Sequence, residues 1–201
     1  MSQPRLLDVA GLPPGAFGSR SLTFWGTLGV VLIESTVFAL AISSYFYFMG
    51  RNPAWPPDGI APPLLRWGTL NTVILLASLI PNELARRAAE RVNLGRVRLW
   101  LTLCLVLALG FNLVRVYEFI GLNVSWDRDA YGSIVWVLLG LHTTHIVTDF
   151  LDSAVLTALM FVGPVEEHRF VDVEENAAYW YFVVLSWLPI YGVIYWAPRL
   201  M

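Results

Sequence analysis

Seven ionisable side chains interrupt otherwise apolar stretches of the sequence, and such residues form hydrogen-bonded pairs or carry protons; five of them lie in the stretches 24–48 and 132–162. Glu34 lies in the stretch 24–48, with no basic residue within two helical turns on either side. The other four are spaced three, four and three residues apart, which places them on one face of a helix: His142, His145, Asp149 and Asp152. An ionised side chain in hydrocarbon costs several kcal/mol without a partner. The partner of Glu34 must therefore come from another segment.

Glu34 and His145 are predicted to lie at similar depths in a bilayer. Glu34 is the tenth residue after Phe24, about 15 Å along a helix. His145 lies about 20 Å from the opposite edge of a hydrocarbon core that is about 30 Å thick. We therefore predict a Glu34–His145 pair, with His142 and Asp149 as a supporting polar face. The pair has two possible roles, a structural hydrogen bond or proton transfer, and the residues alone leave both open.

A second intramembrane pair is expected in the stretch 99–122. Arg115 and Glu118 are one turn apart there, and we predict that they pair with each other in a structural role near the outer surface. The spacing of His142, His145 and Asp149 would also suit a metal ion. The chain has only three His and one Cys, so no residues remain to complete such a site, and we predict no metal and no catalytic residue.

The composition excludes several classes of protein. The 201 residues are 57% hydrophobic and only 14% charged, with a formal net charge of −2. A soluble domain is about 25% charged, and a nucleic-acid binder would need a basic patch. Cys104 is the lone cysteine, which excludes an intrachain disulfide, and all 13 basic residues are Arg, which excludes lysine-based catalysis and a P-loop. An integral membrane protein remains.

The elements that must position these residues are membrane-spanning helices, each of which needs about 20 apolar residues. We predict an all-α membrane bundle with about five transmembrane helices after a polar N-terminal tail at 1–22. The tail is cytoplasmic, and residues 23–201 form one transmembrane domain. The spans are expected at about 24–48, 67–82, 99–122, 132–162 and 177–197.

The arginines of the connecting segments predict the orientation. Eight of them fall on the side that carries the tail and the segment 83–98, against four on the other side. Cytoplasmic loops carry the excess of basic residues, so the N-terminus is expected in the cytoplasm and the C-terminus outside.

Several ordered segments resemble subunit III of the haem–copper cytochrome c oxidases. They are Leu32-Ile33-Glu34-Ser35, Trp55-Pro56-Pro57 with Gly59, Leu70-Asn71-Thr72 with Leu75-Leu76-Ala77-Ser78, Tyr117-Glu118, Tyr131-Gly132-Ser133, Gly140-Leu141-His142-Thr143-Thr144-His145, Tyr179-Trp180-Tyr181-Phe182-Val183 and Ile194-Tyr195-Trp196. The resemblance covers about 24–196. The larger members of this family have seven spans, and this chain is similar to the shorter, five-span bacterial members.

The resemblance implies an accessory, cofactor-free subunit of a proton-pumping oxidase in a bacterial inner membrane. Such a chain stabilises subunit I, joins the other subunits of the complex, holds phospholipids and supports proton uptake. Haem and copper then belong to the partner subunit. An arginine near the cytoplasmic interface would hold a lipid phosphate, and Arg96 and Arg98 are the candidates.

The closing segment departs from the family pattern. Tyr181 stands where the family usually has His, and Val184 stands where it usually has Asp. Two alternatives therefore stay open. One is the five-span, subunit-III-like protein associated with nitric oxide reductases. The other is a transporter or proton channel that acts alone, with Glu34, His145, His142 and Asp149 as a relay.

Overall fold

Long helices account for nearly all of the residues that the structure describes. The computed structural model describes residues 22–57, 59–162 and 168–200, so all but the last residue of the tail predicted at 1–22 lies outside it. The elements are α1 Leu22–Arg51, α2 Leu65–Glu90, α3 Leu94–Ile120, α4 Ala130–Phe161, α5 His168–Tyr191, a π-helical turn at Gly192–Trp196 and α6 Ala197–Leu200. No strand occurs in the described ranges, so the chain is an all-α bundle.

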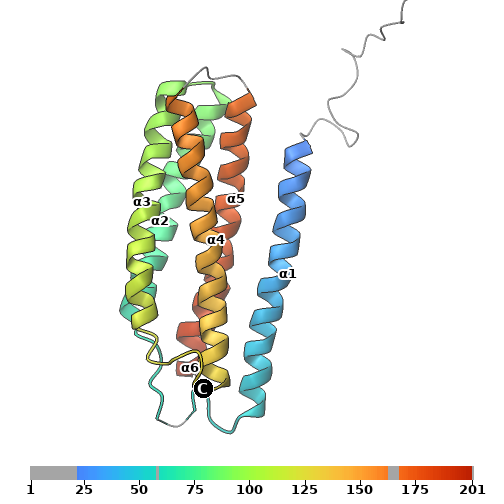
Figure 1. The fold of residues 1–201 in the computed structure, drawn as a ribbon, viewed down its shortest axis with the longest axis vertical. Helices are drawn as coiled ribbons and strands as arrows, with labels where there is room; N and C mark the ends of the chain where they lie inside the picture. Colours follow the sequence, from blue (N-terminus) through green and yellow to red (C-terminus); the bar gives the residue numbers. More distant parts are fainter. Residues whose placement is uncertain (1–21, 58, 163–167, 201) are drawn as a thin grey trace, which may run out of the picture.

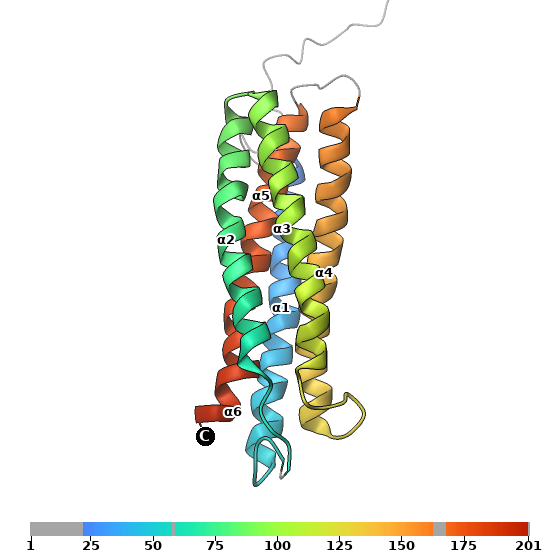
Figure 2. The same ribbon diagram turned by 90° about the vertical axis from the view of Figure 1, so that its left-hand side faces the viewer.

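Helices α2, α3, α4 and α5 form a bundle in which consecutive helices run in opposite directions (Figure 1). Helix α1 stands at the edge and packs mainly against α4 and α5, on the side away from α2 and α3. The start of α1, the α2–α3 connection and the end of α4 lie together at the upper end in Figure 2. Only 6% of the most apolar part of α1 is buried inside the bundle, against 44% for the corresponding part of the helical segment Arg169–Leu200. Most of α1 therefore needs lipid or another protein around it.

Four helices are long and apolar enough to cross a membrane: α1, α3, α4 and the continuous helical segment Arg169–Leu200. Helix α2 contains the expected span 67–82, but it is less apolar than the others. Its polar residues Asn71, Ser78 and Asn82 are buried, so they face the bundle rather than hydrocarbon. Polar side chains on an inward face suit a helix that packs against α3 and α5 along its length.

Local sequence signals explain how the helices begin and how α5 changes its winding. The Asn93 side chain accepts a hydrogen bond from Arg96 N (3.2 Å) and caps α3, and Asp129 caps α4 through Gly132 N (2.7 Å). Pro189 lies inside α5 and cannot donate a backbone hydrogen bond, and the π-helical turn follows directly after Tyr191. Tyr195 lies within this turn, so its side chain points in a different direction from the one that a continuous α-helix would give it.

Candidate functional site

Three helices meet at Glu34. The Glu34 Oε1 atom of α1 lies 3.3 Å from His145 Nε2 of α4, and Tyr179 of α5 donates a 2.8 Å hydrogen bond to Oε2. The His145 ring also contacts the Phe38 ring, with 4.9 Å between their centroids. The Glu34 side chain is 22% exposed and that of His145 is 11% exposed. We call Glu34, His145 and Tyr179 the cleft cluster, since Glu34 and Tyr179 border an open space and His145 contacts Glu34.

The contacts of His145 identify one of its protons. His145 Nδ1 lies 2.7 Å from the Leu141 carbonyl oxygen, which only accepts, so Nδ1 carries a hydrogen. His145 Nε2 faces Glu34 Oε1 at 3.3 Å, and the two residues form an ion pair when the imidazole is protonated. The arrangement therefore places a ring nitrogen that can bind a proton beside a carboxyl group.

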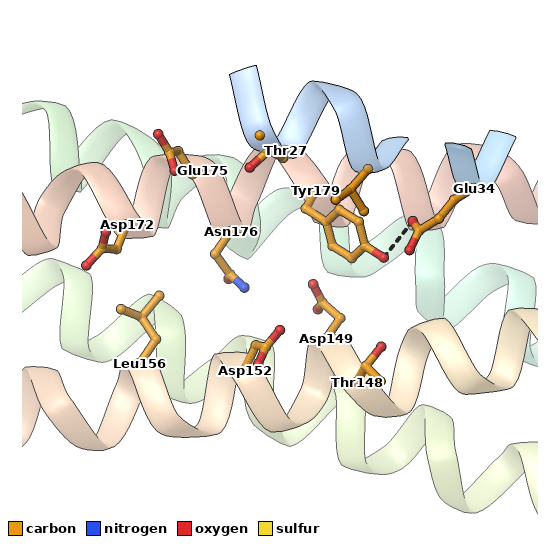
Figure 3. A pocket seen from close by; sticks show the side chains of 12 residues that line it. Thr27, Glu34, Thr148, Asp149, Asp152, Leu156, Asp172, Glu175, Asn176 and Tyr179 are labelled. Atoms are coloured by element: carbon orange, nitrogen blue, oxygen red, sulfur yellow. Dashed lines mark hydrogen bonds between the residues drawn. The ribbon is translucent and has the colours of Figure 1, made fainter. Parts of the chain in front are cut away.

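The open space is a cleft of about 730 Å³ between α1, α4 and α5, and we call it the acidic cleft. Figure 3 shows Asp149 and Asp152 directed from α4 toward Asn176 and Tyr179 of α5, with Glu34 at one end. Its wall carries five carboxylates, Glu34, Asp149, Asp152, Asp172 and Glu175, beside the apolar Val30 and Leu156. Such a wall attracts cations and protons and repels anions.

A second group of polar side chains is enclosed in the bundle. Arg115 Nη1 lies 2.9 Å from Glu118 Oε2, and both side chains are at most 2% exposed. Glu118 also accepts hydrogen bonds from Asn71 Nδ2 and from Tyr195 Oη, the latter at 2.6 Å. Arg115 Nη2 lies 3.1 Å from His142 Nδ1. These five residues join α2, α3, α4 and the π-helical turn, and we call them the sealed cluster.

The contacts of His142 identify its tautomer. Arginine only donates, so His142 Nδ1 accepts from Arg115, and Nε2 donates to the Val183 carbonyl oxygen at 3.0 Å. The imidazole is therefore neutral, and both of its nitrogens are occupied. The Trp187 ring covers this arrangement, with 4.4 Å from its centroid to the Arg115 guanidinium carbon and 4.8 Å between its centroid and that of the His142 ring.

Close packing leaves no room around Tyr195 for a larger residue on α2. A Cβ atom at Gly68 would lie 2.4 Å from Tyr195 Cζ, so the absence of a side chain lets the phenol ring pass α2 and reach Glu118. The sealed cluster therefore depends on a glycine in one helix and a π-helical turn in another.

The polar face predicted on α4 divides into two. His142 and Asp149 are buried, whereas His145 contacts Glu34 of α1 and the exposed Asp152 borders the acidic cleft. His142 therefore serves the sealed cluster rather than Glu34. Asp149 is 3% exposed, borders both the cleft and a smaller cavity inside the bundle, and its Oδ1 atom has no hydrogen-bond partner among the described residues.

The two arginines proposed for lipid phosphate have different surroundings. Arg98 donates a 2.8 Å hydrogen bond from Nε to the Met160 carbonyl oxygen, and its guanidinium lies over the Phe161 ring. Arg96 borders a groove at the α2–α3 connection. The structure thus places the two arginines in different environments.

Sequence reasoning missed several residues that complete these clusters. Tyr179, Asn71 and Tyr195 all belong to segments that were recognised, but a neutral side chain in an apolar stretch gives no charge signal. Tyr181, the replacement for the usual His, donates a 2.8 Å hydrogen bond to Glu83 at the end of α2. The Arg86 guanidinium hydrogen-bonds Glu83 as well and lowers the pKa of that carboxyl to about 2.

With this geometry in hand, similarity to known proteins identifies the family. The family model "Cytochrome c oxidase subunit III" matches residues 23–198, which is nearly the whole described chain. The chain belongs to the cytochrome c oxidase subunit III family. This confirms the resemblance found in the sequence. The matched region includes every residue of the cleft cluster and of the sealed cluster.

Individual relatives have the same printed name, cytochrome c oxidase subunit 3. One from Synechocystis sp. is 24% identical over 182 residues, covering 90% of this chain and 78% of that protein. The human protein is 31% identical and that of Rattus norvegicus is 32% identical, each over 177 residues. Those alignments cover 83% of this chain and 67% of each relative, so this chain spans about two thirds of the mammalian proteins.

Membership of the subunit III family indicates that this chain is an accessory oxidase subunit in a membrane. Within the described residues, no group of three or more His, Cys, Asp or Glu side chains is placed to hold a metal ion. His142 has both nitrogens engaged in hydrogen bonds, and both nitrogens of His145 are in polar contact.

Proposed function

We propose that this chain is the cofactor-free subunit III of a proton-pumping haem–copper oxidase, and that it stabilises subunit I, holds phospholipid and supports proton uptake. The observation that carries the proposal is the cleft cluster, where His145 Nε2 lies 3.3 Å from Glu34 Oε1 and Glu34 lines the acidic cleft. Oxygen chemistry, with haem and copper, belongs to the partner subunit.

The proposed proton role follows from the arrangement of carboxylates. Asp152, Asp172 and Glu175 lie along the cleft toward the end of the bundle where α1 begins, and Glu34 lies deeper. With the N-terminus in the cytoplasm of a bacterial inner membrane, this end faces the cytoplasm. The carboxylates then concentrate protons at the cleft, and Glu34 with His145 takes up one proton and returns it, the added positive charge being offset by the neighbouring carboxylates of the cleft wall.

The proposed structural role rests on the exposed apolar surface of α1. Leu32, Ile33 and Leu40 are 61%, 68% and 64% exposed, so this face needs either lipid or another subunit. The acidic cleft is large enough for part of a lipid and is lined on the α1 side by other residues, including Val30 and Glu34. Arg96 remains a candidate for a lipid phosphate at the same end of the bundle, whereas the Arg98 guanidinium already contacts the Met160 carbonyl oxygen and the Phe161 ring.

The first experiment is to purify the tagged chain in mild detergent and record a reduced-minus-oxidised spectrum with metal analysis. An oxidase haem together with copper is expected to co-purify. Haems b and c with non-haem iron and no copper would assign the chain to a nitric oxide reductase instead. A stable chain without any chromophore would overturn the accessory role and favour the relay that acts alone.

A variant of the complex tests the proton role. Glu34→Gln in the intact oxidase is expected to slow proton uptake, with a defect that grows toward alkaline pH because protons become scarce there. Glu90→Gln is the matched control, since it removes an exposed carboxylate whose contact is with Arg86 on α2. Equal proton uptake in the two variants would contradict the proton role and leave Glu34 as a structural residue.

A further inference from the structure

The α2–α3 connection borders a groove of about 400 Å³ on the side of the bundle away from α1 (Figure 1). We call it the arginine groove. Arg87 and Arg91 come from the end of α2, and Arg96 comes from the first turn of α3. The remaining wall is largely apolar and includes Leu99 and Trp100.

The charges of the arginine groove are mostly uncompensated. Arg87 uses its Nε atom on Glu83 Oε1 at 2.6 Å and keeps its other donors. Arg91 and Arg96 have no side-chain ion pair with any residue in the part of the chain that the structure describes. Three guanidinium groups around one apolar groove repel one another, and an anion between them offsets that repulsion. The groove is therefore suited to an anionic group.

A second groove continues from the first along α3. It has a volume of about 410 Å³, shares Leu99 and Trp100 with the arginine groove, and is lined further along by Leu103, Val106 and Phe161. The step from Trp100 to Val106 is about 9 Å along the helix axis. Its lining is almost entirely apolar, and Trp100 lies at the junction with the charged groove, as tryptophan does at membrane interfaces. The two grooves together suit a charged head and an apolar chain.

We propose that the two grooves bind one anionic phospholipid, with its phosphate between Arg91 and Arg96 and an acyl chain along α3. Arg98 does not hold the phosphate. Its Nε hydrogen bond to the Met160 carbonyl oxygen and its contact with Phe161 make it part of the wall of the chain groove. The inference rests on the lipid-binding part of the proposed function and is independent of the oxidase role.

The proposal also distinguishes the lipid of this site from any lipid in the acidic cleft. The cleft between α1, α4 and α5 carries five carboxylates, whereas the arginine groove between α2 and α3 carries three guanidinium groups. An anionic head group is repelled by the first and attracted by the second. The arginine groove should therefore prefer phosphatidylglycerol to phosphatidylcholine.

Native mass spectrometry of the full-length chain, with any bound subunits, tests this preference. The probes are dioleoyl-phosphatidylglycerol and dioleoyl-phosphatidylcholine, each added to the same detergent preparation. We expect one equivalent of phosphatidylglycerol to be retained in preference to phosphatidylcholine. Each arginine near a membrane surface changes lipid affinity roughly fivefold, so Arg91→Gln with Arg96→Gln should weaken phosphatidylglycerol retention about 30-fold. Arg128→Gln is the matched control on the opposite end of the bundle and should change nothing.

A variant of the chain groove distinguishes a lipid from a bare anion. Leu103→Trp fills the apolar groove without altering charge and should also lower phosphatidylglycerol retention. If this variant retains lipid like the unmodified chain while the arginine variant does not, the groove recognises only a phosphate, and the lipid assignment is overturned. Equal retention of phosphatidylglycerol and phosphatidylcholine would also overturn the lipid assignment. So would an arginine variant that loses a co-purifying subunit but keeps its lipid. Haem co-purification reports separately on the oxidase role.

Discussion

The sealed cluster and the cleft cluster each contain a charged pair inside the same bundle, but their surroundings differ. Arg115 and Glu118 are enclosed by Asn71, His142 and Tyr195, and their pair is at most 2% exposed. Glu34 borders a cleft of about 730 Å³ and contacts His145, and the two side chains are 22% and 11% exposed. A fully enclosed charge has no alternative partner, whereas a group at a cleft is accessible from its surroundings. We therefore expect the first cluster to act on stability, and the proposed proton role concerns the second.

The largest expected effect comes from breaking the sealed cluster. Arg115→Met leaves Glu118 as an enclosed carboxylate without its cation, and removal of one partner of a buried ion pair costs about 3–5 kcal/mol. We expect a large fall in the melting temperature of the purified chain or its complex. Arg115→Met combined with Glu118→Gln should recover part of that loss, because no charge is left unpaired. A double variant less stable than the single one would contradict this interpretation.

A smaller effect is expected for the charged pair of the cleft cluster. Glu34→Gln and His145→Ala should each lower the free energy of unfolding by about 1 kcal/mol, since the pair is partly solvated. The double variant should lose less than the sum of the two, with a coupling of about 0.5 kcal/mol or more. The measurement is a thermal or denaturant titration of all four proteins. Strict additivity would show that the two side chains are not coupled.

The Tyr179 hydroxyl gives a further, more local test. Tyr179→Phe removes one hydrogen bond to Glu34 and should cost about 0.5–1.5 kcal/mol of stability. Tyr47→Phe on the exposed face of α1 is the control and should cost less. In a Glu34→Gln background the effect of Tyr179→Phe should shrink, because a neutral amide is a weaker acceptor than a carboxylate. An undiminished effect would indicate that Tyr179 acts through other contacts.

The smallest effect is expected at the exposed residue of the α4 polar face. Asp152→Asn should change the free energy of unfolding by less than about 0.5 kcal/mol, as is usual for an exposed position. The same variant in the oxidase complex should nevertheless slow proton uptake at alkaline pH, because it removes a carboxylate from the cleft. Unchanged proton uptake would restrict the proton role to the cleft cluster itself.

The α4 residues show what spacing predicts and where it stops. Residues three apart on a helix differ by about 60° around its axis, whereas residues seven apart nearly coincide. The pattern therefore contains two faces rather than one, His142 with Asp149 and His145 with Asp152. The sequence could not tell which face meets α1, because that depends on how α3 and α5 pack against the other side.

The residues by themselves determined that this chain crosses a membrane, that Glu34 needs a partner from another helix, and that Arg115 and Glu118 lie one turn apart. These conclusions follow from the cost of charge in hydrocarbon and from helical spacing. The tertiary structure decided that His142 serves Arg115, that Tyr179 completes the contact at Glu34, and that Tyr195 reaches Glu118 past Gly68. Each of these contacts joins residues far apart in the chain, and the packing of the helices brings them together.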